Sequence, residues 1–571
     1  MKNQWISLSL CLVLFSIGVP ARGQNQALVV EGGTLIDGTG RGGVKDAVVV
    51  MEGARIKEIG AKGRTTYPAG ARIINAEGKT ILPGFIDGHI HFTAWMPQLF
   101  LHFGVTTVYD TANPTDWIIA QRDALRKGRI KGPRMFVTGV AVDGPIERSN
   151  PNHPAELGGY KVHVRTTEEA KAMVRELAGA GVDAIKVHEG LMPELLKAVV
   201  DEAHKHGLEV VGHSHNATYA ANAGLKFIEH TWPIVNATIT DAAKLKEIDD
   251  KNISSPDYMM EPAQFDSLVG TLLKAGMYFN PTIAVSKYWR TSSPHAKEWR
   301  DAVVKFSEES TLRFVPQQER QAWLGTMKAR TTVDPGTMEQ TLLGFKKAME
   351  FTRKYAAVGG KFVAGPDTGG GDHGLVPGLA LHFEMQALVE DGGLTPMQAI
   401  MSVTRWPAEL FHKEKELGTL EAGKVADAII VDGDPLTDIR ATRNIRVVIK
   451  DGKVIDTAFD PNFENPLPRT VYEEAVMGSH GPAISGINPK AAHESDSELT
   501  LQVLGKNFNQ HSVVRFDTTD LKTQFLDSTK LTATVSGALL KKFGTYAITV
   551  VNPGSGGGTS IPVYFLVNFR D

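Results

Sequence analysis

The sequence predicts an α/β fold: a (β/α)8 TIM-like barrel with a composite β-sandwich subdomain beside it and an immunoglobulin-like β-sandwich at the C-terminus. Three observations support this. Eight short apolar runs alternate with helical stretches in the middle of the chain. Hairpin patterns flank that region on both sides. The last hundred or so residues read as short strands separated by turn residues.

The eight apolar runs are the expected barrel strands. Helical patterns separate them; in residues 166–181, for example, threonines can cap the start, acids occupy the first turn and glycine follows the end. An open doubly wound sheet, the alternative, would need fewer strands and an early phosphate loop. The runs are GFIDGHIH (84–91), VTTVYD (105–110), RMFVTG (134–139), DAIKVH (183–188), LEVVGHSH (208–215), KFIEH (226–230), MYFNPTIA (277–284) and KFVAGPD (361–367).

Two hairpin patterns enclose the predicted barrel. Residues 47–60 turn at Glu52-Gly53, and residues 445–457 turn at Asp451-Gly452. We therefore expect one β-sandwich subdomain, formed by residues 24–82 together with 413–460, around a barrel over 83–412.

The C-terminal region has a different character. After a linker over 461–479, residues 480–571 hold short strand patterns with turn residues between them. Through its NP, GKNF and YAITVVNPG segments this region resembles the IPT/TIG family of immunoglobulin-like domains. The resemblance implies a spacer or a module for surface or glycan attachment, without catalytic residues.

The N-terminus and the charge balance limit where the protein acts and on what. Residues 1–23 have the layout of a signal peptide cut after Gly23, with a retained anchor as the alternative, so we expect a periplasmic or secreted protein. The only cysteine, Cys11, lies in this segment, and no later apolar run is long enough to span a membrane. With 61 basic and 64 acidic residues, the composition favours a small-molecule substrate over nucleic acid.

Polar residues recur where the expected strands end, which is where barrel enzymes place their sites. His89 and His91 are two residues apart, so both imidazoles lie on one face of an extended strand and can reach one ion. Histidines exposed after a strand are the alternative for this pair alone. The candidate metal ligands are His89, His91, Lys186, His213, His230 and Asp367.

Lys186 is the unexpected member of this set. An ammonium group on a barrel strand is costly to bury, so it must be paired, reach solvent, or be chemically altered. Reaction with carbon dioxide would convert it into a carbamate, an anionic ligand that can bridge two cations.

The motifs PGFIDGHIH, GVTTVYDTA, IKVH, VVGHSH, FIEH, GPDTG and LGTLEAGKVADAIIVDGDP resemble those of the amidohydrolase superfamily, specifically its imidazolonepropionase-like and prolidase-like group, over about residues 27–457. The resemblance implies two divalent ions, usually zinc, bridged by carboxylated Lys186. It assigns His89, His91 and Asp367 to the buried metal, and His213 and His230 to the more exposed one. Pro366 departs from the family pattern, which commonly has Thr or Ser before the aspartate.

These residue types suit hydrolysis by a metal-bridging hydroxide. Asp367 can take the proton of the attacking water and pass it to the leaving nitrogen. We expect an exported hydrolase of carbon–nitrogen bonds that acts on a peptide-like or N-acyl amino acid substrate, with prolidase-like (Xaa-Pro) dipeptide hydrolysis leading. The alternatives are a hydrolase of lactones, cyclic amides or organophosphate esters, and a secreted binding protein without catalysis.

Further residues are candidates for the substrate pocket. His215 lies two residues after His213 and can orient the substrate carbonyl or support a ligand. The long loop 141–165 carries four possible carboxylate-binding residues, and the insertion 285–350 can form a lid or a subunit contact, so we expect a homo-oligomer. His188 is assigned no role, and GGGDHG (369–374) is interpreted as a loop instead of a dinucleotide site. The four loop candidates are Arg148, His153, Tyr160 and Arg165.

Overall fold

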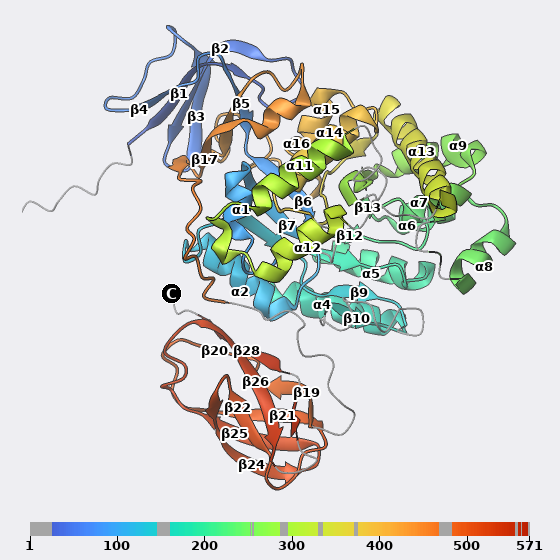
Figure 1. Ribbon diagram of the computed structural model, residues 1–571, viewed down its shortest axis with the longest axis vertical. Helices are drawn as coiled ribbons and strands as arrows, with labels where there is room; N and C mark the ends of the chain where they lie inside the picture. Colours follow the sequence, from blue (N-terminus) through green and yellow to red (C-terminus); the bar gives the residue numbers. More distant parts are fainter. Residues whose placement is uncertain are drawn as a thin grey trace, which may run out of the picture.

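A computed structural model of the chain has three parts: a β-rich end, a central α/β body and a C-terminal pair of sheets (Figure 1). The predicted signal peptide, Arg148, His153 and most of the predicted linker lie outside the described residues. The structure describes residues 26–145, 160–251, 253, 256–285, 295–328, 335–369, 375–467, 482–553, 558–560 and 562–568.

The central body contains eight parallel strands, one at each of the eight apolar runs. Within each sheet, adjacent strands of this set pair in parallel. The strands are β6 (Phe85–Ile90), β7 (Val105–Asp110), β8 (Arg134–Val137), β11 (Ala184–Val187), β12 (Glu209–Gly212), β13 (Phe227–Glu229), β14 (Tyr278–Asn280) and β15 (Lys361–Phe362).

These strands do not form one closed sheet, which corrects the simple eight-stranded expectation. They belong to a three-stranded sheet, β6-β7-β8, and a seven-stranded sheet that ends in β15. The two sheets meet at two seams, one between β8 and β11 and one between β6 and β15. Backbone hydrogen bonds cross both seams: Asp183 N donates to Val137 O at 2.8 Å at one, and Gly88 N donates to Ala364 O at 3.1 Å and His91 N to Thr368 O at 2.8 Å at the other. The ladders stop there because several of these strands are only two to four residues long.

A short parallel ribbon, which the sequence patterns did not indicate, extends the seven-stranded sheet. Its strands are β9 (Ala141–Asp143) and β10 (Lys161–His163). Val142 of β9 pairs with Val187 of β11, and His188 N donates to Val142 O at 3.0 Å. The loop after β8 therefore returns to the carboxyl end of β11.

Helices surround the parallel strands, and residue patterns explain their ends. Thr166, one of the two threonines expected to cap α4, is its N-cap. Thr166 and Glu169 form a capping box, in which each side chain accepts from the backbone N–H of the other residue, and the helix ends at Gly181 in the left-handed conformation. The helices are α1 (Pro97–His102), α2 (Thr115–Arg126), α4 (Thr167–Ala180), α5 (Pro193–Lys205), α6 (Ala217–Ala223), α7 (Trp232–Thr238), α8 (Ala242–Lys251), α9 (Phe265–Ala275), α11 (Ala296–Ser307), α12 (Gln317–Lys328), α13 (Pro335–Ala357), α14 (Leu379–Glu390), α15 (Pro396–Ser402) and α16 (Arg405–Leu410).

The β-rich end is an eight-stranded sheet made from both sides of the central body. The antiparallel pairing of β5 with β16 joins the two chain segments, and alternate side chains form a separate apolar core. The strands are β1 (Leu28–Leu35), β2 (Val44–Glu52), β3 (Arg55–Ala61), β4 (Arg72–Asn75), β5 (Lys79–Pro83), β16 (Ala428–Asp432), β17 (Ile445–Lys450) and β18 (Lys453–Ile455).

The C-terminal region folds into two β-sheets around its own core, at the other end of the molecule (Figure 1). Arg129 of the central body contacts it through Glu494, 3.9 Å away, and the ring of Phe543. The immunoglobulin-like identity of this region stays a prediction. Its strands are β19 (Ala483–Asn488), β20 (Ala491–His493), β21 (Leu499–Lys506), β22 (Val513–Phe516), β23 (Thr519–Asp520), β24 (Lys522–Asp527), β25 (Lys530–Val535), β26 (Gly544–Asn552), β27 (Gly558–Thr559) and β28 (Val563–Asn568).

Within the described part of the chain, no helix combines the length and the apolar character that crossing a membrane requires.

Candidate metal centre

The six predicted ligands converge at the carboxyl ends of the parallel strands. Two lie within the strands β6 and β11, and four lie in the residues that follow β6, β12, β13 and β15: His89, Lys186, His91, His213, His230 and Asp367. The chain after β15 can approach β6 because Gly365 has no side chain; a Cβ there would lie 2.4 Å from His89 N. Despite Pro366, Asp367 points inward, and its N–H donates to His89 O at 3.1 Å.

The imidazoles direct their Nε2 atoms at two carboxylates. His89 Nε2 and His91 Nε2 lie 3.4 Å and 3.2 Å from Asp367 Oδ1. His230 Nε2 lies 4.0 Å from Asp367 Oδ2. His213 Nε2 lies 3.5 Å from Oε2 of Glu229, the last residue of β13.

For three of these histidines the opposite ring nitrogen is held by an oxygen. His91 Nδ1 lies 3.4 Å from the carbonyl of Ala112, and His213 Nδ1 lies 3.0 Å from Glu189 Oε2. His230 Nδ1 lies 2.8 Å from the hydroxyl of Thr282, whose own proton goes to Pro281 O. Each oxygen accepts from Nδ1–H, so in the neutral ring the lone pair is on Nε2.

In the neutral rings these lone pairs face oxygens of Asp367 and Glu229. The buried atoms His89 Nε2, Asp367 Oδ1 and Glu229 Oε1 have no hydrogen-bond partner among the described residues. A cation placed between these atoms would bind both the imidazole lone pairs and the carboxylate oxygens, whereas unpaired buried polar atoms are costly. Imidazole and carboxylate ligands suit zinc, so the residues fit a divalent metal site.

Two overlapping groups offer three ligands each. His89, His230 and Asp367 form one, and His213, Glu229 and His230 form the other; within each group the ligand atoms lie within 4.8 Å of one another. The two groups share His230, which places two potential metal positions side by side.

Glu229 is the site residue that sequence reasoning missed. Its side chain is fully buried and contacts Lys186 Nζ directly, and His89 Nε2 lies 3.7 Å from its Oε2. The signal was present in KFIEH, where an acid precedes the ligand histidine at a strand end. Lys186 is thus a buried lysine paired with a carboxylate, one of the alternatives open from sequence. Gly212 makes room for it, because a Cβ there would lie 2.9 Å from Lys186 Cδ.

Burial and neighbouring charges shift the protonation of the site residues in different directions. Burial opposes a charge on His91, but the hydrogen bond with Asp367 and the charge of that carboxylate outweigh burial and raise the pKa of His91. Burial lowers the pKa of His89 well below its usual value despite the nearby Asp367 carboxylate. Burial and the neighbouring His188 lower the pKa of His213 in the same way. Burial by itself raises the pKa of Asp367, but the imidazoles of His89 and His91 outweigh it, and the net pKa lies well below the usual range. Neutral imidazoles and an ionised carboxylate are what a cation binds.

A second polar cluster, which includes His188, adjoins the site. His188 is buried, and its Nδ1 lies 2.5 Å from Glu189 Oε2 and 3.5 Å from Asp143 Oδ2. The β9–β10 ribbon supplies Asp143 and also Lys161, whose Nζ lies 3.1 Å from Asp143 Oδ2.

The predicted substrate-pocket residues that the structure describes are His215, Tyr160 and Arg165, and each contacts a neighbouring helix or strand. The ring of His215 stacks on Tyr219 of α6, with centroids 6.4 Å apart. Tyr160 is half-buried and accepts a hydrogen bond from Ala141 N through its carbonyl, at 2.7 Å. Arg165 is exposed before α4, and its N–H donates to Glu169 Oε2 at 2.6 Å. Their roles stay predictions.

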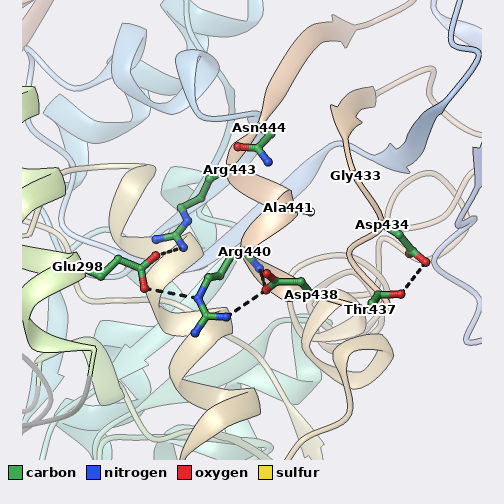
Figure 2. Close-up of a pocket in the computed structure, with 9 residues that line it drawn as sticks. All are labelled: Glu298, Gly433, Asp434, Thr437, Asp438, Arg440, Ala441, Arg443 and Asn444. Atoms are coloured by element: carbon green, nitrogen blue, oxygen red, sulfur yellow. Dashed lines mark hydrogen bonds and ion pairs between the residues drawn. The ribbon is translucent and has the colours of Figure 1, made fainter.

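A separate pocket of about 660 Å³ lies between α11 and residues 433–444, away from this centre (Figure 2). Figure 2 shows that Arg440 and Arg443 both turn to Glu298, and Arg440 Nη1 also lies 3.3 Å from Asp438 Oδ1. Its arginines neutralise acids within the protein and so do not form an evident anion site.

Comparison with known proteins agrees with this geometry. The 5-methylthioadenosine/S-adenosylhomocysteine deaminase of Symbiobacterium thermophilum is 39% identical over 67 residues, which are 12% of this chain and 15% of that protein. The dihydroorotase of Trichlorobacter lovleyi is 46% identical over 65 residues, 11% of this chain and 14% of that protein. The chain thus matches only a small part of the length of these curated relatives.

Solved structures match over far more of the chain. A putative prolidase from Bifidobacterium longum aligns with a TM-score of 0.55 at 21% identity, over 76% of this chain and 95% of that one. A Xaa-Pro dipeptidase with bound methionine gives 0.52 at 24%, over 76% and 100%. Phenylurea hydrolase B gives 0.56 at 20%, over 77% and 99%. At these identities the likeness shows the shared fold, a TIM barrel with an added β domain.

The family model for the amidohydrolase family matches residues 80–455, about two thirds of the chain and all six predicted ligands. The match agrees with the expectation of a metal-dependent hydrolase of carbon–nitrogen bonds. The chain belongs to the amidohydrolase family.

Proposed function

We propose that the protein hydrolyses an amide bond in a peptide-like or N-acyl amino acid substrate, with Xaa-Pro dipeptides as the leading candidates. The observation that carries the proposal is the set of imidazole Nε2 atoms gathered around the Asp367 and Glu229 carboxylates at the carboxyl ends of the strands. Among the similar structures, one is named a prolidase and one a Xaa-Pro dipeptidase, which supports this substrate class.

The centre has ligands for two divalent cations, and we propose zinc because the donors are imidazoles and carboxylates. Bound cations of this kind supply Lewis acidity that activates water and polarises the scissile carbonyl. Asp367 Oδ1 lies between His89 and His91, while Oδ2 is turned toward His230. We assign Oδ2 the role of accepting the proton of the attacking water and passing it to the leaving nitrogen.

Lys186 carries the proposal of a bridging carbamate. A carbamate and the Glu229 carboxylate are both anions, so their close contact requires cations. We therefore propose that carboxylation of Lys186 depends on metal loading. In the metal-free protein Lys186 would instead stay paired with Glu229.

The test begins with metal analysis of the protein purified with zinc and bicarbonate, beside Lys186→Ala. About two ions per chain in the wild type, fewer in the variant, and chelator-sensitive turnover of Xaa-Pro dipeptides would support the proposal. One ion or none in the wild type would contradict the two-metal centre.

The same preparation separates the alternatives. Turnover of lactones or organophosphate esters but not of dipeptides would replace the amide substrate. Two bound ions without turnover of any of these classes would favour a binding protein.

A further inference from the structure

A chain of polar contacts runs from the β9–β10 ribbon to His213. Lys161 Nζ lies 3.1 Å from Asp143 Oδ2, which lies 3.5 Å from His188 Nδ1. The same nitrogen lies 2.5 Å from Glu189 Oε2, and this oxygen lies 3.0 Å from His213 Nδ1. The contacts alternate in charge and end on the imidazole whose Nε2 faces the metal centre.

The start of this chain is firmly held. Asp143 is buried, and its Oδ1 accepts hydrogen bonds from Gly144 N and Gly190 N, both at 2.8 Å. Lys161 and Asp143 side chains are each 3% exposed. Gly190 and Gly144 approach so closely that a Cβ on Gly144 would lie 1.9 Å from Gly190 O. The segment that carries His188 and Glu189 is thus fastened to the ribbon on both sides of the pair.

A third metal ion does not explain the cluster. His188, Glu189 and His213 could present ligands to one ion, but two ligands of a zinc ion at about 2.0–2.1 Å each lie well beyond 2.5 Å from one another. At 2.5 Å the His188 and Glu189 atoms are in direct contact. The ammonium of Lys161 beside Asp143 also opposes a further cation there.

We infer that Glu189, paired with His188, is a positioning residue that orients His213 for the more exposed metal. Its carboxylate accepts the Nδ1–H of His213, fixes the ring orientation and keeps the lone pair on Nε2. The inference rests on the proposed function, because it concerns one of the two metal positions. It explains why the loop after β8 returns as a parallel ribbon to the end of β11.

The test measures metal affinity in Glu189→Ala, Glu189→Gln and the control Glu194→Gln, by chelator competition of the zinc-loaded full chain. Glu194 is an exposed acid in the first turn of α5, so its variant removes the same charge nearby. We expect Glu189→Ala to weaken one of the two ions about 10- to 100-fold and leave the other unchanged. Glu189→Gln keeps an oxygen acceptor and should restore most of the affinity, and the control should match the wild type.

The visible spectrum of the cobalt-loaded protein gives a readout of ligand geometry. A changed spectrum in Glu189→Ala that returns in Glu189→Gln supports positioning. Unchanged affinity and spectrum in Glu189→Ala overturn the inference, as does equal weakening in both Glu189 variants or a third ion in the wild type. A wild type that binds no metal would instead refute the proposed function.

Discussion

The buried pair Lys186–Glu229 gives the sharpest test of how the centre is built. The Lys186 side chain is 1% exposed and that of Glu229 is 0% exposed, and the two are in direct contact. Removing one member leaves the other charge buried without its partner, which costs about 3–5 kcal/mol, whereas replacing both by groups of similar volume is often neutral or stabilising. Lys186→Met should therefore destabilise the metal-free protein strongly, and Lys186→Met/Glu229→Leu should recover most of the loss.

The assay is thermal unfolding of chelator-treated protein. About 2 °C per kcal/mol is expected for a unit of this size, so Lys186→Met should lower the apparent Tm by roughly 6–10 °C. Lys197→Met is the matched control, because Lys197 pairs with Asp201 at 2.5 Å while both side chains are about half exposed. Such an exposed pair contributes at most about 1 kcal/mol.

Two results would refute the reasoning. If Lys186→Met and Lys197→Met shift the Tm equally, the buried pair is not the source of the stability. If the double variant is no more stable than Lys186→Met, the unpaired Glu229 charge is not what destabilises the single variant.

Three further predictions follow from other parts of the molecule. Gly365→Ala should abolish binding of at least one zinc ion, because its Cβ would lie 2.4 Å from His89 N. The control Gly179→Ala, on the open face of α4, should keep both ions and gain about 0.5–1 kcal/mol of stability. Equal zinc binding in the two variants would contradict the packing argument. Burial raises the pKa of Glu384 to about 7, so its contribution to stability is present below about pH 4.5 and is lost, by about 3 kcal/mol, as pH rises through 7. Urea unfolding at pH 5 and pH 8 should show this loss of stability in the wild type and not in Glu384→Gln. An equal loss in both proteins would refute the prediction. The exported protein should begin at Gln24 on N-terminal sequencing, and a retained Met1 would contradict cleavage.

Local pattern was sufficient for most of the elements and for placing six candidate ligands at strand ends, but it indicated neither the β9–β10 ribbon nor Glu229. All eight apolar runs became strands, and α4 is capped by Thr166, one of the two threonines predicted to cap it, because neighbours along the chain decide both features. The six candidate ligands needed only one tertiary assumption, that parallel strands of a barrel end on the same side.

The sequence by itself thus determined most of the strands and helices and six of the histidines, lysines and acids that stand at strand ends. Tertiary structure alone decided the partners of those residues. Successive residues of a regular strand point to opposite faces, so Glu229 and His230 could not both be expected inside. The backbone of His230 leaves the strand conformation, with φ of 64°, and both side chains reach the centre. The contacts of His213 with Glu189, and of His188 with Asp143, likewise depend on how far the loop after β8 folds back, a long-range pairing that no local pattern encodes.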